Sequence, residues 1–202
     1  MKALTNQEQR IVQHLIEIGY NNAASSFSSL VKQPVTIEAL CFEIAETSTK
    51  VPITYQDGNM TLVTTDIMGE AGGRSYLLLS ESECSALQGV CAPSISDEEQ
   101  RKVMQEAIVK EIDNILSAAV LTEFSNALDL HVFGGVPHLF ILPCQEMKGK
   151  IEEDFAAADD GYCLTANTRF LLEENTQLQP QFFWRLTTDF LHRIEKYVAT
   201  NL

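Results

Sequence analysis

The chain has 202 residues, of which 14 are Lys or Arg and 28 are Asp or Glu, so its formal net charge is −14. This excess of negative charge disfavours nucleic acid and anionic membranes as main partners, because both would repel it and no Lys/Arg cluster compensates. Hydrophobic residues make up 45% and charged residues 21% of the chain, which excludes a disordered protein and is typical of a globular domain.

Nothing in the sequence indicates insertion into a membrane or secretion. No apolar run reaches the roughly 18 residues of a membrane-spanning helix, and the first eight residues turn polar at once, without a signal-peptide core. The five cysteines are odd in number and include no Cys-x-x-Cys pair, which favours free thiols in a reducing compartment. We therefore expect a cytoplasmic protein.

A long helix is predicted first. Thr5-x-x-Glu8 is a capping box, and apolar residues recur at helical spacing from Ile11 to Val31, before Pro34. Strands are predicted over 35–44, 51–55, 60–65 and 74–79. Asp57-Gly58 predicts a hairpin before the strand 60–65, the glycine-rich segment 69–73 predicts a tight turn, and a short helix is expected over 80–90.

The same order of elements is predicted again after residue 92. A second capping box, Ser96-x-x-Glu99, begins a long helix whose apolar stripe is Met104, Ile108, Ile112, Ile115, Ala119 and Phe124. Strands are predicted over 132–133, 138–142, 163–172 and 181–186, and helices over 146–158 and 190–198. The acidic run 152–154 is interpreted as a solvated helix face.

Short sequence matches accompany this repeated order. Glu17-Ile18-Gly19 resembles Glu111-Ile112-Asp113, and each match is followed by a Phe, Phe27 or Phe124. The separations are ten and thirteen residues (27 − 17 and 124 − 111), so the first helix is predicted to have lost nearly one turn. We predict a single α/β domain of two pseudo-symmetric halves, 1–92 and 93–202, with a mostly antiparallel sheet and two long packed helices.

The candidate site lies in the middle of the second long helix. A rotation of 100° per residue places Glu111 and Asn114 about 60° apart on one helix face, and Ala107 and Ala118 flank them there. Two methyl side chains would let a partner approach closely. On spacing alone, an ordinary polar pair on a solvent-exposed helix face is the favoured interpretation, because Glu-x-x-Asn is a weak motif. Sequence motifs of serine hydrolases, zinc proteases and nucleotide-binding loops are missing from the chain.

The surroundings of this pair carry a family resemblance. Asn114 is followed by 22 residues (137 − 114 − 1) and then by Pro137, within Gly134-Gly135-Val136-Pro137. The earlier half contains a Gly-x-x-x-Gly turn at 69–73, then an apolar strand and a short helix. Together with the duplicated helix, these features resemble the CheC/CheX/FliY family of chemotaxis phosphatases. The length and the two-copy arrangement are most similar to CheC.

The resemblance implies a CheC-like fold and a hydrolase that acts on the phospho-aspartate of a CheY-type response regulator, in chemotaxis or related two-component signalling. It implies that the helix enters the regulator's active site, where Asn114 would orient the attacking water and Glu111 would pair with the regulator's Lys. Pro137 would be a supporting part of the motif. The chain would need no metal or cofactor of its own, because the regulator would supply Mg²⁺.

The first half departs from the family pattern. Glu17 is followed at the third position by Tyr20 instead of Asn, and a phenol cannot hold a water with the geometry of an amide. We therefore expect one active site, in the second half, and a degenerate first site at Glu17 and Tyr20. Two alternatives stay open: a non-catalytic adaptor that docks a response regulator or a CheD-like deamidase, and a purely structural dimer.

Overall fold

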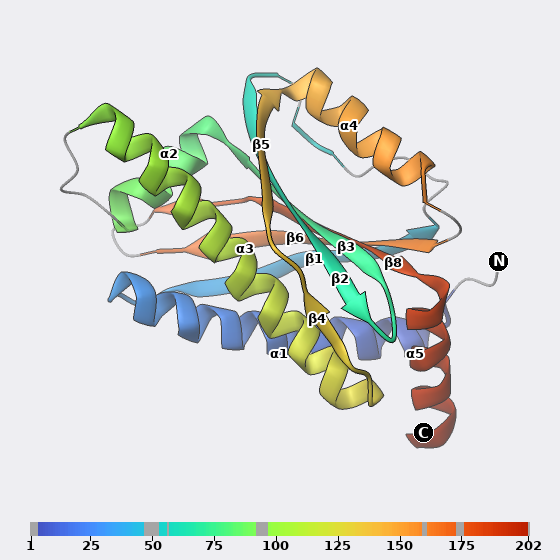
Figure 1. The fold of residues 1–202 in the computed structure, drawn as a ribbon. Helices are drawn as coiled ribbons and strands as arrows, with labels where there is room; N and C mark the ends of the chain where they lie inside the picture. Colours follow the sequence, from blue (N-terminus) through green and yellow to red (C-terminus); the bar gives the residue numbers. More distant parts are fainter. Residues whose placement is uncertain are drawn as a thin grey trace.

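The computed structural model describes residues 4–46, 53–55, 57–91, 97–158, 161–172 and 176–201. Within these ranges the chain forms five helices and one eight-stranded sheet (Figure 1). The helices are α1 (Asn6–Val31), α2 (Glu81–Cys91), α3 (Glu98–Leu128), α4 (Cys144–Ala156) and α5 (Thr188–Asn201). The strands are β1 (Thr36–Glu46), β2 (Asn59–Gly69), β3 (Gly73–Ser80), β4 (Val132–Gly134), β5 (His138–Pro143), β6 (Gly161–Leu171), β7 (Gln177–Leu178) and β8 (Gln181–Thr187). None of the described helices is long and apolar enough to cross a membrane.

The sheet interleaves strands from both parts of the chain. Its order is β1-β6-β8-β3-β2-β4, with β5 also paired to β2 and β7 to β6. All of these pairs are antiparallel. The early strand β1 pairs with the late strand β6, and the later strands β4 and β5 pair with the early strand β2. The prediction of an α/β fold with an antiparallel sheet is confirmed.

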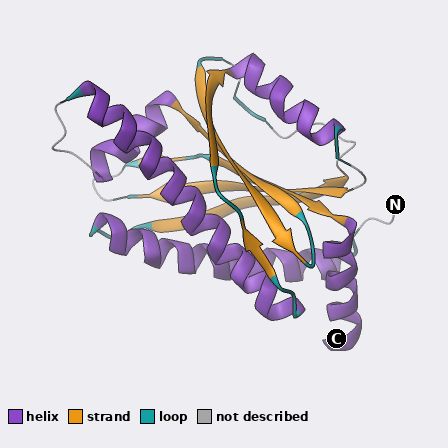
Figure 2. Cartoon of the chain, in the orientation of Figure 1, coloured by secondary structure: helices purple, strands orange, loops and turns teal. Residues whose placement is uncertain are grey.

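The long helices α1 and α3 pack against each other, as predicted (Figure 1). A Cβ atom on Gly19 of α1 would lie only 2.8 Å from the Cα atom of Val120 in α3, so glycine permits the two backbones to approach this closely. Near this crossing, the Asn22 amide donates to the Glu123 carboxylate at 2.9 Å. Figure 2 shows α4 standing apart from the other helices.

Two apolar clusters lie on opposite faces of the sheet. Alternation along β2 directs Val63 into the large cluster shared by α1, α2, α3 and α5, and Leu62 into a smaller one under α4. Both side chains are fully buried. In the smaller cluster, Met147, Ile151 and Phe155 of α4 pack on the sheet. The sheet is therefore covered on both faces, by different helices.

One of the two predicted capping boxes is confirmed. Thr5 and Glu8 cap α1 reciprocally, with backbone-to-side-chain distances of 2.6 and 3.3 Å. At the start of α3 the N-cap is Asp97, which accepts from the backbone N–H of Gln100 at 2.8 Å. The predicted box of Ser96 and Glu99 is therefore wrong by one residue, and Ser96 lies outside the described residues.

Two strand-level predictions are wrong. Residues 53–55 are not in a strand, and 51–52 lie outside the described residues. Asp57-Gly58 does not connect a hairpin, because β2 pairs with β3, β4 and β5, all of which follow it. The hairpin is formed instead by β2 and β3 around the predicted tight turn. Gly69 of this turn has a φ of +117°, and a Cβ there would lie 1.9 Å from the His131 carbonyl oxygen.

The buried faces of α1 and α3 match at two offsets in the numbering. At an offset of 97 (Val12 with Val109, Phe27 with Phe124) and at an offset of 101 (Val12 with Asp113, Phe27 with Leu128), eight of the nine buried α1 residues have a buried α3 residue. No missing turn is needed between the helices. The predicted correspondence of Glu17 with Glu111, an offset of 94 (111 − 17), matches only four of the nine buried α1 residues and is therefore wrong.

Candidate functional site

The central turns of α3 present Glu111 and Asn114 to solvent. Both side chains are exposed, and so are Ala107 and Ala118 on the same helix face. The exposure that the helical spacing predicts is therefore confirmed. A carboxylate and an amide therefore lie between two alanines, whose small side chains let a partner approach the helix closely.

The opposite side of α3 holds the helix on the sheet. Ile108 and Ile112 are buried in the large cluster, and Ile115 is partly buried against it. Met104, which was predicted to belong to the same buried stripe, is exposed. The core contacts therefore fix which face of the helix points outward around Glu111.

Neither Glu111 nor Asn114 bonds to another side chain in the part of the chain that the structure describes. The comparable exposed residues of α1 are engaged: Glu17 accepts from the Gln13 amide at 2.8 Å, and Asn22 donates to Glu123. The hydrogen-bonding groups of Glu111 and Asn114 are therefore available to an external partner. They need not break an internal bond first.

A buried polar contact lies directly beneath this face. Asp113 is fully buried, and its Oδ2 atom accepts from the Thr65 hydroxyl of β2 at 2.6 Å. One turn on, the hydroxyls of Ser117 and Ser75 share a hydrogen bond of 3.1 Å. Burial raises the pKa of Asp113 to about 6, and the Thr65 and Ser117 hydroxyls offset part of this effect. Sequence patterns indicated Asp113 only as part of the repeated helix motif and did not predict that it is buried.

The Pro137 segment passes beside α3. It connects β4 to β5, and the backbone N–H of Gly135 donates to the Asp66 carbonyl at 2.8 Å. A Cβ on Gly134 would lie 4.0 Å from a methyl group of Leu121, which follows Asn114 by two helical turns. The loop that contains Pro137 therefore lies beside the C-terminal half of α3, at the edge of the sheet.

Apolar side chains are exposed at both ends of this helix face. At the sheet edge Met68 pairs with Phe133, and the exposed fractions of Phe133 and Val136 are 57% and 79%. Toward the start of α3, Val103 is 66% exposed beside Met104. Exposed apolar groups around a polar pair are typical of surfaces that bind another protein.

On α1, the described helix of the first half that carries Glu17 and Tyr20, these two residues form no equivalent surface pair. Tyr20 is buried, and its hydroxyl shares a hydrogen bond of 3.1 Å with Thr168 of β6. Burial raises the pKa of Tyr20 well above its usual value. Tyr20 therefore fills the core and cannot meet a partner, whereas Glu17 is exposed; that this pair is a degenerate site stays a prediction.

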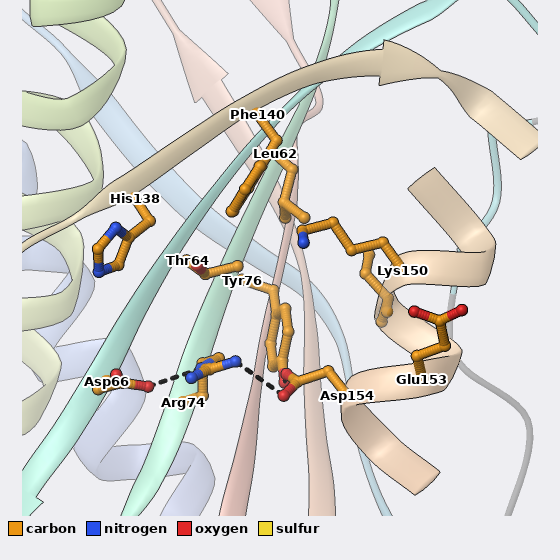
Figure 3. Close-up of a pocket in the computed structure, with 11 residues that line it drawn as sticks. Leu62, Thr64, Asp66, Arg74, Tyr76, His138, Phe140, Lys150, Glu153 and Asp154 are labelled. Carbon is orange, nitrogen blue, oxygen red and sulfur yellow. Dashed lines mark hydrogen bonds and ion pairs between the residues drawn. The ribbon is translucent and has the colours of Figure 1, made fainter. Parts of the chain in front are cut away.

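A cavity of about 370 Å³ lies on the other face of the sheet, under α4 (Figure 3). Arg74 stands at its base between Asp66, at 2.6 Å, and Asp154, at 2.7 Å. The Tyr76 hydroxyl also donates to Asp154, so the predicted solvated role of Asp154 is wrong. Above them, the Lys150 ammonium lies 4.0 Å from the centre of the Phe140 ring.

This cavity carries a charge network that ties α4 to the sheet. The charge of Arg74 is already balanced by two carboxylates from two different elements. Among the described residues, no group of three or more His, Cys, Asp or Glu could hold a metal ion. The α3 face, whose polar groups are unpaired, is the better candidate for a functional site.

No protein-family model and no curated protein matches the sequence. Solved structures do. FliY of Thermotoga maritima is similar at a TM-score of 0.71 and 13% identity, covering 100% of both chains. FliM of Helicobacter pylori, in a complex with FliG, is similar at 0.59 and 10%, covering 95% of this chain and 98% of that one. CheX of Borrelia burgdorferi, in a complex with CheY, BeF₃ and Mg²⁺, is similar at 0.51 and 14%, covering 84% and 96%.

Identities this low establish the fold alone. The similarity to FliY nonetheless extends over the whole of both chains, and the other two structures cover most of this one. FliY and CheX are among the proteins that the family resemblance names. The chain therefore has the CheC/CheX/FliY-type fold, which the middle part of FliM shares.

Proposed function

We propose that this protein dephosphorylates the phospho-aspartate of a CheY-type response regulator, with Glu111 and Asn114 as its catalytic pair. The observation that carries the proposal is the exposure of both side chains, without internal partners, on one face of α3. The fold supports it, because CheX, which shares this fold, was solved in a complex with CheY.

The proposed chemistry fits these two groups. Phosphoryl transfer depends mainly on positioning and on the balance of charge. The Asn114 amide can accept from a water with its oxygen and donate with its nitrogen, and so hold that water in line with the phosphoryl group. The Glu111 carboxylate would pair with a Lys ammonium of the regulator. In this proposal the Mg²⁺ belongs to the regulator, and this chain supplies the water geometry and the charge pair.

The shape of α3 suits insertion into an active site. Ala107 and Ala118 leave the face of the helix low on both sides of the pair. The exposed apolar residues at its two ends, Val103 and Phe133 among them, would contact the regulator around its active site. We propose that they contribute to docking and that Glu111 and Asn114 contribute to turnover.

The test is a phosphate-release assay. The purified protein is mixed, in excess Mg²⁺, with a panel of CheY-type regulators phosphorylated by a small-molecule donor. We expect faster release with at least one regulator and loss of the acceleration in Asn114→Ala. Asn126→Ala is the matched control, because Asn126 is an exposed asparagine of the same helix. If wild-type protein accelerates no regulator in the panel, the proposal is wrong.

A non-catalytic adaptor is the second candidate, favoured by the likeness to FliM, which was solved with FliG, and by the exposed apolar residues. A CheD-like partner on the long helices would be a variant of this candidate. It predicts binding of a regulator or another protein without release of phosphate. Equal rates for wild type and Asn114→Ala would favour the adaptor.

A further inference from the structure

Asp113 is a buried carboxyl group that the proposed chemistry does not use. Its Oδ2 atom accepts from Thr65, but its Oδ1 atom is buried with no hydrogen-bond partner among the described residues. Burying an incompletely bonded carboxyl group costs free energy. A fold gains nothing from such a residue unless the residue serves another purpose.

The packing of α1 shows that the fold does not need a carboxyl at this place. Asp113 corresponds to Ile16 of α1 at an offset of 97 and to Val12 at an offset of 101, the two offsets at which the buried faces match. Both Ile16 and Val12 are fully buried in the large apolar cluster. An apolar side chain is therefore sufficient to pack a long helix on this sheet at the equivalent position. At that position α3, the helix with the candidate site, buries the carboxyl group of Asp113 instead.

Asp113 also occupies a special place relative to the site. It lies between Glu111 and Asn114 in the sequence and points the opposite way, into the sheet. Consecutive residues of a helix are separated by a fixed rotation of about 100°. The core contacts of Ile108 and Ile112 turn this side of α3 toward the sheet, and a bond that fixes the direction of Asp113 acts with them to fix the direction in which Asn114 leaves the helix.

We propose that Asp113 is a positioning residue: its bond to Thr65 sets the rotation of the turn of α3 that carries Glu111 and Asn114, and protonation of Asp113 alters this setting. The kinetic part of this inference rests on the proposed phosphatase function. The structural part does not, because the rotation of the turn can be observed in the protein alone.

No charged group compensates Asp113 in its surroundings. From β2 it meets Thr65, and Ser117 of its own helix connects to Ser75 of β3. Titratable groups buried on the helices packed against α3 are Glu8 and Tyr20 of α1 and Cys84 of α2. Glu8 bonds to the backbone of Thr5, Tyr20 bonds to Thr168, and none of the three contributes to the shifted pKa of Asp113. Among the described residues, β4, β5 and α5 bury no titratable side chain.

The first test observes the side-chain amide of Asn114 by NMR during a titration from about pH 5 to about pH 8, a range that spans the raised pKa of Asp113. We expect the Asn114 signals, assigned by their loss in Asn114→Ala, to shift with a midpoint near pH 6. The Asn126 signals should stay constant, and Asp113→Asn should abolish the shift at Asn114. Asn114 signals that do not change across the titration would overturn the proposal, whether or not the protein is a phosphatase.

The second test measures dephosphorylation of a regulator that wild-type protein accepts. Asp113→Asn keeps an oxygen for Thr65 but resembles the protonated acid, so its kcat should stay at the value that wild type has at low pH, without the change near pH 6. Asp113→Leu and Thr65→Val each remove the bond, and should lower kcat about ten- to a hundredfold with little change in KM, because small misplacements of a reacting group reduce turnover by such factors. Circular dichroism verifies that the variants fold. We expect Asp113→Leu to fold, because α1 buries an apolar residue at the equivalent position. Wild-type kcat in both folded variants would contradict the inference.

Discussion

Asp113 is buried without a charged partner, which predicts an unusual dependence of the free energy of unfolding on pH. A carboxyl group with a pKa raised in the folded state binds its proton more tightly there than in the unfolded chain. Its favourable contribution is therefore complete below the unfolded pKa of 3.8 and is lost as the pH rises through about 6. Asp113→Asn carries no titrating proton and should lack this loss, while its amide still accepts from Thr65.

The size of the effect follows from the same values. The pKa rises from 3.8 to about 6, and each unit corresponds to about 1.4 kcal/mol of differential stability. The full effect is about 3 kcal/mol, and the free energy of unfolding of wild-type protein, relative to Asp113→Asn, should fall by about 2 kcal/mol of it between about pH 4 and pH 7.5, because the unfolded chain is already partly deprotonated at pH 4. Other titrating groups are common to the two proteins and cancel in this difference.

Urea unfolding followed by circular dichroism measures the difference directly. Wild type and Asp113→Asn are unfolded at several values between about pH 4 and pH 7.5. Ser117→Ala removes a hydroxyl that lowers the pKa of Asp113 and leaves the carboxyl in place, so it should keep the pH-dependent loss and enlarge it. A difference between wild type and Asp113→Asn that is the same at every pH would show that Asp113 has an ordinary pKa, and the reasoning from its burial would be wrong.

Three further predictions concern the site and the helix pair. Asn114→Ala should lower the maximal rate of regulator dephosphorylation by about 10²–10³ with binding retained; steady-state kinetics beside Asn126→Ala decides, and an unchanged maximal rate would contradict a catalytic role. Glu111→Ala should weaken regulator binding, most at low salt, whereas Glu17→Ala should leave binding and turnover unchanged; equal losses would show that both helices act. Gly19→Ala should destabilise the fold by about 1–3 kcal/mol, because its Cβ would lie 2.8 Å from the facing helix backbone; wild-type stability in urea would refute this close approach.

Local signals predicted the parts of the fold that local interactions determine. The Thr5–Glu8 box and the helical spacing predicted α1, and short runs of apolar and β-branched residues predicted the strands of the β2–β3 hairpin. The Asp57-Gly58 signal failed for a different reason. Turn chemistry predicts a bend but not the strand that will pair after it, and β2 obtains its partners from later in the chain.

The candidate site was predictable because helical periodicity determines which face is exposed. The positions of Glu111 and Asn114 follow from that rule alone, and the structure confirms their exposure. Asp113 could not be found in the same way, because a carboxylate beside two polar neighbours is normally interpreted as solvated. Its burial becomes evident only when Thr65, distant in sequence, is placed beneath it.

The interleaved sheet has a consequence for synthesis on the ribosome. Thr36 of β1 pairs with Leu171 of β6, so the strand waits for 135 further residues (171 − 36) before its partner emerges. Tyr76 of β3 likewise waits for Phe183 of β8. Non-local pairing of this kind slows folding and leaves strand edges unpaired in the nascent chain. A ribosome stalled midway would therefore carry an apolar hairpin without its neighbours, a state that chaperones recognise, and premature termination would release an aggregating fragment instead of half a functional protein.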